Sequence, residues 1–547
     1  MTTTVLGGAL GECVHVAGII NFLRLAESQG YRTEFTGPAT SIADFIDAAR
    51  EVDPDILAVS YRLTPENAVL LLQDLHAALR EAGLAGKRLV FGGTPPVAAE
   101  ARTSGLFEAV FSGEEPTEAI IAYLKGVPFD QATAADYPAE TIPRLAWKAP
   151  FPLLRHHFGI PADSVAPTIA GVRQIAEAHV LDVISLGADQ DAQENLFHPE
   201  RQDARRKGAG GVPFRSAADL EALYAASRTG NYPLLRSYSG TSDLLEYAEL
   251  LRRTIHNAWC ATSLFWFNVV DGRGPLSLRE SIADHMALMR WHGERGIPVE
   301  GNEPHHWELR DGHDTVACAA AYIYAYVAKR MGVTDYICQY MFETPPHLSN
   351  RMDLAKMLAK IVLAEGQAAP GFRLLRQTRT GLMSYPVDVA AARAQLAASV
   401  YLQMALAPGI VHVVGHSEAD HAATAEDVIE SCLMARHVIE IALRGIPDMT
   451  ADPVVQRRRD ALVEDATVIV DAIRQLGTGK AADPLLDPDV LARAVEIGLL
   501  DAPHLRGNPY ACGRVRTRIV DGANLAVDEH GRVLSETERV QRILGEL

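Results

Sequence analysis

The chain has 547 residues, of which 48% are hydrophobic and 22% charged, as expected for a globular protein with room for about two or three domains. A net charge of −18 argues against nucleic acid or an anionic membrane as a partner, although a small acidic substrate needs only a local arginine cluster. The six scattered cysteines include no C-x-x-C pair, and no run of about 18 apolar residues appears. We therefore expect a soluble, cytoplasmic protein without a disulfide scaffold.

Residues 1–125 alternate short β-rich runs with amphipathic helical segments. The strand-like runs are 5–6, 33–35, 56–59, 88–91 and 109–111. Strands separated by helices indicate a parallel sheet with helices on both faces. We predict an α/β domain of the flavodoxin-like type over this segment.

Three short motifs follow predicted strands of this domain. Residues 11–18 read GECVHVAG, residues 60–63 read SYRL and residues 92–93 are a diglycine. Ligands of doubly wound sheets bind at the carboxyl edge, where each motif would lie. The neutral imidazole of His15 is a suitable ligand for a transition metal there.

The combination of His-x-x-Gly, a serine with a nearby leucine, and Gly-Gly resembles the cobalamin-binding domain of corrinoid mutases and methyltransferases. The resemblance implies that His15 ligates cobalt from below and that Gly18 lets the next helix start against the nucleotide tail. The cofactor-binding residues that it implies are Cys13, His15, Gly18, Ser60, Leu63, Gly92 and Gly93. The alternative is an ordinary flavodoxin-like domain in which His15 is a loop histidine.

The chain departs from the family pattern at two positions. Cys13 stands where the family has an aspartate that hydrogen-bonds the ligating imidazole, and Glu12 is the nearest carboxylate. Two residues, instead of one, separate Ser60 from Leu63. The family motif therefore matches this chain better at Ser60 than at Leu63.

Residues 126–165 are rich in proline and alanine without a sustained period, and we predict a linker there. Over 166–421, strand-like runs recur with helices between them, at 180–186, 233–238, 263–270, 298–302, 336–342, 372–377 and 410–415. Such units fit a (β/α)8 barrel of the TIM type better than a second open sheet. For residues 422–547 we predict a helical extension, with helices at 425–444 and 453–476 and a short β tail at 515–533.

Barrel active sites lie at the carboxyl ends of the strands, so the polar residues there are the candidates. The candidate catalytic residues are Glu300, Glu303, His306 and Glu418. The candidate substrate-binding residues are Arg236, Asn268, Arg310, Arg373, Arg376, Arg379 and His416. The competing interpretations are ion pairs with helix carboxylates for Arg373 and Arg376, and helix capping for Asp189 and Asp191.

The three arginines of one predicted strand suggest the kind of substrate. Alternation places Arg373 and Arg379 on one face and Arg376 on the other. A guanidinium that reaches the lumen can clamp a carboxylate in a bidentate fork. Glutamates at 300, 303 and 418 could then hold an ammonium or hydroxyl group, so we predict a small carboxylated substrate, with an amino acid as one candidate.

A second resemblance lies near the C-terminus. Residues 493–503 read RAVEIGLLDAP, and Gly513-Arg514 and Asp521-Gly522-Ala523 follow. This looks like the tail of the glutamate mutase catalytic subunit, a barrel that encloses the adenosyl side of adenosylcobalamin. The alternative is an unrelated glycine-capped helix and β-hairpin.

Together the two resemblances imply a cobalamin-dependent isomerase, fused to its cofactor domain and working as a homodimer. Homolysis of the Co–C bond of adenosylcobalamin would give a radical that removes a substrate hydrogen before a 1,2-shift. The alternatives are a methylcobalamin-dependent methyltransferase resembling methionine synthase, and a non-catalytic cobalamin sensor. The cluster of His412, His416 and Glu418 lacks a thiolate, so a zinc site that activates a thiol acceptor is unsupported.

Overall fold

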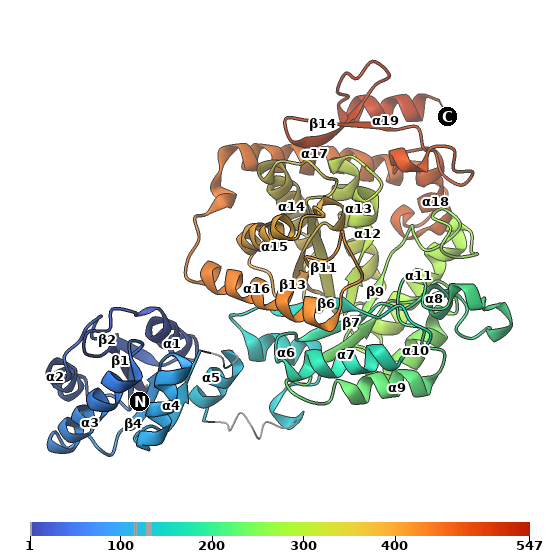
Figure 1. The fold of residues 1–547 in the computed structure, drawn as a ribbon. Coiled ribbons are helices and arrows are strands. Elements are labelled where there is room, and N and C mark those ends of the chain that lie inside the picture. Colours follow the sequence, from blue (N-terminus) through green and yellow to red (C-terminus); the bar gives the residue numbers. More distant parts are fainter. Residues whose placement is uncertain (1–2, 114, 116, 127–133, 547) are drawn as a thin grey trace. The chain divides into compact units, whose positions relative to one another are not determined.

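The computed structural model describes residues 3–113, 115, 117–126 and 134–546. The chain forms two compact units, Met1–Thr133 and Ala134–Leu547 (Figure 1). Residues 127–133 of the expected linker lie outside the described residues. No helix among the described residues is long and apolar enough to span a bilayer.

Unit 1 contains a five-stranded parallel sheet of order β2-β1-β3-β4-β5. Its strands are β1 (Thr4–Ala9), β2 (Arg32–Phe35), β3 (Ile56–Ser60), β4 (Arg88–Gly92) and β5 (Ala109–Phe111). The helices are α1 (Ala17–Ser28), α2 (Ile42–Val52), α3 (Pro65–Glu81), α4 (Pro95–Ser104) and α5 (Thr117–Leu124). This order confirms the predicted flavodoxin-like fold.

Alternation along the strands of unit 1 supplies two cores, one on each face of the sheet. Val5 and Ile56 pack with Phe22 of α1 on one face. Leu6 and Leu57, the next residues along each strand, pack on the other face among side chains of α2, α3 and α4. Burial on both faces explains why β1 and β3 are almost entirely apolar, whereas the edge strand β2 is more exposed and carries Arg32 and Glu34.

Unit 2 contains eight parallel strands of order β8-β7-β6-β13-β12-β11-β10-β9, which is chain order around a barrel. The strands are β6 (Leu153–Phe158), β7 (Val183–Leu186), β8 (Leu234–Ser237), β9 (Cys260–Thr262), β10 (Val299–Gly301), β11 (Asp335–Phe342), β12 (Arg373–Thr380) and β13 (Ile410–Val413). At the junction of β8 and β9, the Ala258 N–H donates to the Leu235 carbonyl over 2.9 Å. The sheet is thus nearly closed, and the predicted (β/α)8 fold is confirmed.

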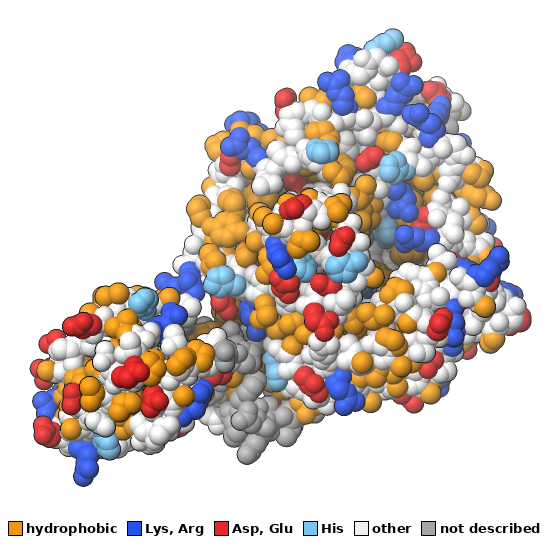
Figure 2. All heavy atoms as spheres, in the orientation of Figure 1, with side chains coloured by type: hydrophobic (Ala, Val, Ile, Leu, Met, Phe, Trp, Pro, Cys, Tyr) orange, Lys and Arg blue, Asp and Glu red, His pale blue; other side chains and the backbone are white. Residues whose placement is uncertain are grey.

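Helices surround these strands (Figure 1). They include α7 (Ala166–Glu177), α9 (Ala217–Ala226), α10 (Leu244–Thr254), α11 (Leu278–Gly293), α13 (Asp314–Arg330), α14 (Asn350–Glu365) and α15 (Val389–Gln403). Their apolar faces form two large cores against the outside of the barrel. The visible surface of the unit mixes acidic, basic and apolar side chains (Figure 2).

The structure corrects three predictions of extent. β6 lies inside the segment predicted as a linker. Its sequence lacks a continuous apolar pattern because Arg155 and His157 point into the barrel lumen, where they bond to Glu300 and Tyr238. The predicted strand 263–270 is a buried loop, and β9 precedes it, because the aromatic run packs at the strand end with Trp266 and Trp307 rings 4.7 Å apart. Helix α16 (Ala425–Leu443) packs on β6, α7 and α15, so it belongs to the barrel although 422–547 was predicted as an extension.

The rest of the C-terminal segment contains helices and a β-hairpin. Helix α17 (Pro453–Leu476) packs against α13 and α14, and α18 (Pro488–Glu496) packs against α11. Strands β14 (Arg516–Val520) and β15 (Ala523–Val527) form an antiparallel hairpin, and α19 (Glu536–Gly545) follows.

Candidate functional site

A cavity of about 390 Å³ opens at the carboxyl edge of the sheet of unit 1. His15 and Gly18 reach it from the β1–α1 segment, Ser60 from the end of β3, and Gly92 and Gly93 from the end of β4. Strands β1 and β3 are neighbours, and the chain leaves them toward opposite sides of the sheet. The three sequence motifs therefore meet at the switch point where doubly wound folds bind ligands.

The walls of this cavity fit a bound group that enters between the strands. Ser60 is buried, and its Oγ atom has no hydrogen-bond partner among the described residues. A Cβ added at Gly18 or Gly92 would meet no atom within 4 Å, whereas one at Gly93 would lie 2.8 Å from the Tyr61 carbonyl oxygen. His15 is exposed in its loop, so its imidazole is free to meet a ligand above the cavity.

Two of the predicted cofactor residues do not line this cavity. Cys13 is fully buried in the core with Leu6 and Leu10, so its thiol cannot support the His15 imidazole. Leu63 is 39% exposed, because the extra residue after Ser60 turns it outward while Tyr61 takes the buried position.

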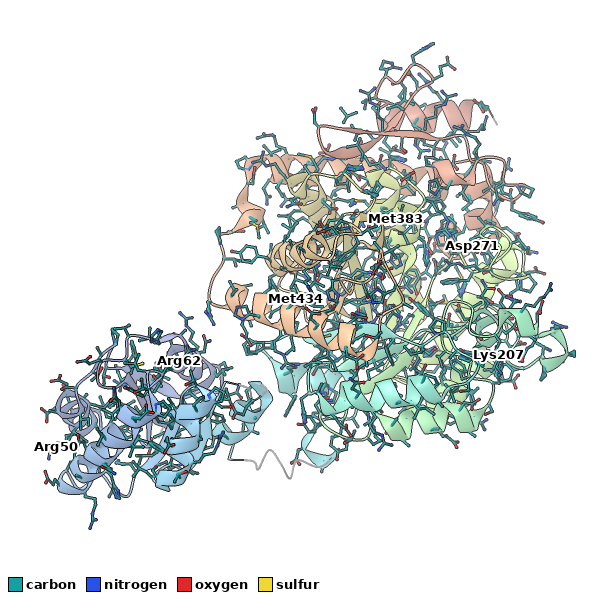
Figure 3. The ribbon with its side chains drawn as sticks, in the orientation of Figure 1. Arg50, Arg62, Lys207, Asp271, Met383 and Met434 are labelled. Atoms are coloured by element: carbon teal, nitrogen blue, oxygen red, sulfur yellow. The ribbon has the colours of Figure 1, made fainter. Side chains whose placement is uncertain are left out.

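Sequence reasoning missed Arg62, Ser112 and Glu115, which do line the cavity (Figure 3 labels Arg62). Glu115 accepts hydrogen bonds from the Ser112 backbone N–H at 2.7 Å and the Ser112 hydroxyl at 2.9 Å. Ser112 directly follows β5, so the rule that polar groups gather at strand ends could have found it.

A second cavity, of about 450 Å³, lies at the carboxyl ends of the barrel strands. Arg155 of β6, Glu300 of β10, Gln339 of β11 and Arg379 of β12 line it from the barrel wall. Segments that follow the strands add further polar side chains, namely Gln190, Gln193, Glu194, Arg206, Tyr238, Thr241, Arg273, Asn302, His305 and His306. This is the position of the active site in barrels of this type.

Glu300 is an anion held between two arginines. Its carboxylate accepts from Arg155 Nη1 at 2.9 and 3.0 Å and from Trp259 Nε1 at 2.5 Å, and it lies 3.2 Å from Arg236 Nη2. Burial alone would raise the pKa of Glu300, but Arg155, Arg236 and Trp259 lower it to about 2. Glu300 therefore positions the guanidinium groups and does not accept a proton at neutral pH.

The arginines keep unused hydrogen-bonding capacity. Arg236 is fully buried, and no nitrogen of its guanidinium makes a hydrogen bond to a described residue. Arg379 is 8% exposed, with its Nε also without a partner there. Burial and Arg236 lower the pKa of Arg155 to about 9, which leaves it charged at neutral pH. The floor of the cavity is therefore positively charged, with Arg379 in its wall offering a donor to an anion and Arg236 adding positive charge behind Glu300.

Four histidines surround this surface in their neutral form. Burial, and then neighbouring positive groups, lower the pKa of His157, His305, His306 and His412 well below the ordinary value. Arg155 Nη2 lies 3.2 Å from His157 Nε2 and can only donate, so Nε2 is the unprotonated nitrogen of this ring. The Tyr238 hydroxyl, 2.9 Å from the same nitrogen, therefore donates to it as well. These rings offer hydrogen bonds without charge.

Several predicted site residues have structural partners instead. Glu303 accepts from Ser263 Oγ, the Leu264 and Phe265 N–H groups and Trp307 Nε1, and it fixes the loop after β9. Asn268 bonds to Phe265, Val270 and Ser281 in that loop, and Arg310 lies over the Trp266 ring and 3.4 Å from Asp271. These residues build the rim, and Glu303, Asn268 and Arg310 do not line the cavity.

The predicted site residues on and after β12 and β13 also divide into those with structural partners and those that line the cavity. Arg376 faces outward and pairs with Glu365 of helix α14 at 2.6 Å, as the competing interpretation predicted. Arg373, at the start of β12, pairs at 2.6 Å with Asp335 of the neighbouring strand β11 and not with a helix carboxylate. His416 pairs with Glu430 at 3.0 Å, and Glu418 is exposed. The structure therefore brings together Glu300, His306 and Arg379 in the cavity wall, with Arg236 against Glu300.

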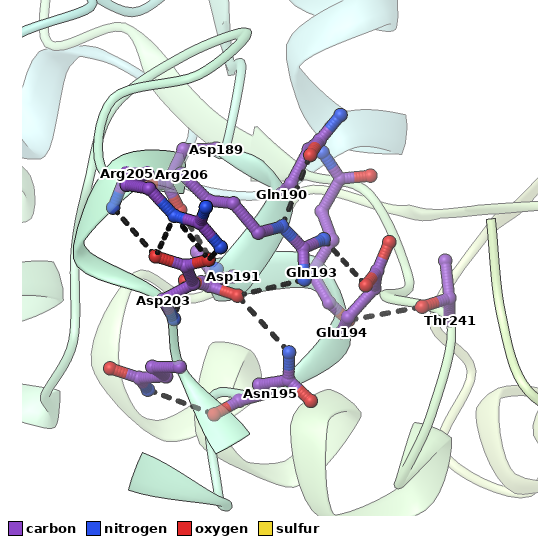
Figure 4. A network of polar contacts seen from close by, with 12 residues as sticks. Asp189, Gln190, Asp191, Gln193, Glu194, Asn195, Asp203, Arg205, Arg206 and Thr241 are labelled. Atoms are coloured by element: carbon purple, nitrogen blue, oxygen red, sulfur yellow. Dashed lines mark hydrogen bonds and ion pairs between the residues drawn. The ribbon is translucent and has the colours of Figure 1, made fainter. Parts of the chain in front are cut away.

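A loop between α8 (Gln190–Glu194) and α9 supplies part of the rim that the sequence did not reveal. Arg206 reaches back to α8, 2.6 Å from Glu194 and 3.2 Å from Asp191 (Figure 4). Asp189 accepts from the Ala192 N–H at 2.8 Å, which confirms its predicted role as a helix cap. No three His, Cys, Asp or Glu side chains within the described ranges are placed to hold a metal ion.

Comparison with known proteins bears on unit 1 above all. Residues 3–121 match the family model described as the B12 binding domain, which confirms the predicted cobalamin-binding domain. A solved structure of a novel cobalamin-binding protein from Desulfitobacterium hafniense is 20% identical, over 23% of this chain and 59% of that protein, with a TM-score of 0.21.

The cobalamin-dependent S-adenosylmethionine radical enzyme OxsB, with aqua-cobalamin and S-adenosylmethionine bound, is 13% identical over 90% of this chain and 70% of its own, with a TM-score of 0.20. Its apo form is 11% identical over 88% and 69%, with a TM-score of 0.17. At these scores the whole-chain similarities assign no activity.

Proposed function

We propose that the protein is an adenosylcobalamin-dependent mutase that rearranges a small carboxylated substrate in the barrel. The observation that carries this proposal is the combination, in one chain, of a B12-binding domain and a barrel cavity lined by the buried Arg155 and Arg379, of which Arg379 keeps an Nε without a partner among the described residues. The resemblance of the C-terminal tail to glutamate mutase supports the same class of reaction.

In unit 1, the residues of the cavity fit cobalamin. The Ser60 hydroxyl offers a donor and acceptor inside the cavity, Gly18 and Gly92 leave space, and the imidazole of His15 would ligate the cobalt. Bound adenosylcobalamin would supply an adenosyl radical by homolysis of its Co–C bond, and the protein would bind, orient and exclude water.

In the barrel, the side chains suit a rearrangement without net proton transfer. Arg379, with Arg155 beside it in the cavity wall, would hold the carboxylate, and Tyr238 and the neutral histidines would orient the rest of the substrate by hydrogen bonds. Glu300 stays ionised and these histidines stay neutral at physiological pH, as their pKa shifts indicate. A radical 1,2-shift needs no general base.

This arrangement predicts a flat pH profile. Since neither Glu300 nor the cavity histidines change protonation between about pH 6 and 8, kcat/KM should vary by less than about twofold over that interval. Initial rates at several buffered pH values, with the cofactor saturating, measure this. With a carboxylate substrate, which does not itself titrate in this interval, a steep rise or fall near pH 6.5 would show that a histidine titrates during the reaction and would contradict the assignment.

The experiment that tests the proposed function compares upper ligands of the cofactor. The full chain is loaded with adenosylcobalamin, methylcobalamin or hydroxocobalamin, and small acids are screened by NMR for a rearranged carbon skeleton. We expect rearrangement with adenosylcobalamin alone. Methyl transfer from methylcobalamin to an acceptor would contradict the mutase proposal and favour the methyltransferase. No conversion with any form of the cofactor would favour the non-catalytic cobalamin sensor.

A further inference from the structure

We infer that the molecule bound in the barrel is a small dianion that carries no ammonium group. The inference rests on the proposed function only in taking the barrel cavity as the substrate site. It excludes the amino acid that the sequence suggested, and it admits a phosphate monoester beside a dicarboxylate.

The inference starts from the charges around the cavity. The lining residues include four arginines, at 155, 206, 273 and 379, and two glutamates, at 194 and 300. Arg236 lies against Glu300 and adds a fifth guanidinium. The histidines in the wall add hydrogen-bonding groups but no negative charge.

Both glutamates are already engaged. Arg206 Nη2 lies 2.6 Å from Glu194 at the rim (Figure 4). Glu300 is shared by Arg155 and Arg236 and also accepts from Trp259, so one carboxylate faces two guanidinium groups. Arg379 has no ion-pair partner within 4 Å among the described side chains, and at the rim Asp271 is shared by Arg273 at 3.9 Å and Arg310 at 3.4 Å. Around the floor, the guanidinium groups of Arg155, Arg236 and Arg379 therefore face the single carboxylate of Glu300, and two negative charges on the ligand would balance the excess.

An ammonium group would find no counter-charge there. Its nearest carboxylate in the floor is Glu300, which two guanidinium groups already neutralise, and Arg379 would repel it across a site of low dielectric. Glutamates 303 and 418, which the sequence offered for this role, lie outside the cavity wall. A neutral histidine or the Tyr238 hydroxyl would suit a hydroxyl or carbonyl group instead.

A cavity of about 450 Å³ limits the ligand to a small molecule. Two kinds of small molecule share the required chemistry, since a dicarboxylate and a phosphate monoester both present two negative charges to arginine forks. Both belong to the inferred class, and the experiment distinguishes them.

The test is calorimetric titration of the full chain loaded with hydroxocobalamin, which cannot supply an adenosyl radical and so reports binding without turnover. The ligands are glutarate, glutamate (the same skeleton with an ammonium group), valerate (one carboxylate fewer) and glycerol phosphate. We expect glutarate or glycerol phosphate to bind at least about tenfold more tightly than glutamate and valerate. Whichever of the two binds more tightly identifies the ligand as a dicarboxylate or as a phosphate monoester.

Two variants of the same strand make the result specific. Arg379→Gln should weaken dianion binding about tenfold or more and remove most of the preference over valerate. Arg373→Gln, at the exposed start of β12, should leave both unchanged. Glutamate binding as tightly as glutarate, or equal binding by the Arg379→Gln variant, would overturn the inference.

The outcomes also separate this inference from the proposed function. Tight dianion binding without any adenosylcobalamin-dependent rearrangement would contradict the mutase proposal and leave the inferred ligand class standing. Adenosylcobalamin-dependent rearrangement of an amino acid would support the mutase proposal and overturn the inference that the ligand is a dianion without an ammonium group.

Discussion

Replacing His15 by alanine is expected to weaken cobalamin binding by about 100-fold or more, because even the second-shell partners of metal-binding histidines affect metal affinity by about 10- to 100-fold. His15 is exposed at the mouth of the cavity whose floor holds Ser60 and the diglycine. The variant should also lose the spectral change that accompanies replacement of the cofactor's own base by histidine. Equilibrium dialysis and visible spectra of the full chain measure both.

His76→Ala provides the matched control for this change. His76 is an exposed histidine of α3 in the same unit and does not line the cavity. Its removal should change neither affinity nor spectrum. If the His15→Ala variant bound cobalamin with wild-type affinity and an unchanged spectrum, the assignment of the lower ligand would be wrong.

Replacing Glu300 by alanine is expected to lower the free energy of unfolding of the barrel by about 3–5 kcal/mol, because Arg155 and Arg236 would remain buried without their counter-charge. Acetate should partly restore the stability of this variant by occupying the vacated space, while it should have little effect on the wild type. Urea denaturation followed by tryptophan fluorescence, with and without acetate, measures the difference.

Glu430→Ala is the control, since this glutamate is 44% exposed on its side chain and pairs with Arg393 at the surface of the barrel. Its loss should cause no comparable shift of the denaturation midpoint. A Glu300→Ala variant as stable as the wild type would show that the guanidinium groups do not depend on Glu300, and the charge balance inferred for the cavity would fail with it.

The fold could be predicted from the sequence wherever apolar periodicity reports burial. The central strands of unit 1 and most barrel strands are apolar runs separated by helices, and the polar edge strand β2 was found from its place between two helices. β6 was missed because a barrel strand that points an arginine and a histidine into the lumen has no apolar alternation to recognise. β9 was displaced because the aromatic run after it packs as a loop, and burial alone does not distinguish a loop from a strand.

The candidate sites differ in how much the sequence could reveal. The cobalamin motifs are local, so His15, Gly18, Ser60 and the diglycine could be identified from short segments. The barrel cavity depends on pairs that are far apart in the chain, such as Arg155 with Glu300 and Arg206 with Glu194. Alternation separates Arg376 from Arg379, but it does not tell which of the two faces is inside.

The most direct test of the central proposal is electron paramagnetic resonance of the full chain loaded with adenosylcobalamin and mixed with the dianion that binds most tightly. We predict a cobalt(II) signal that appears only with the dianion, and a nitrogen splitting whose multiplicity changes when the protein is labelled with ¹⁵N-histidine. That result would tie radical formation to the barrel ligand and would identify the lower ligand as a histidine, of which His15 is the one that lines the cavity of unit 1. A dianion-independent signal, no signal, or a splitting unaffected by the label would contradict the account.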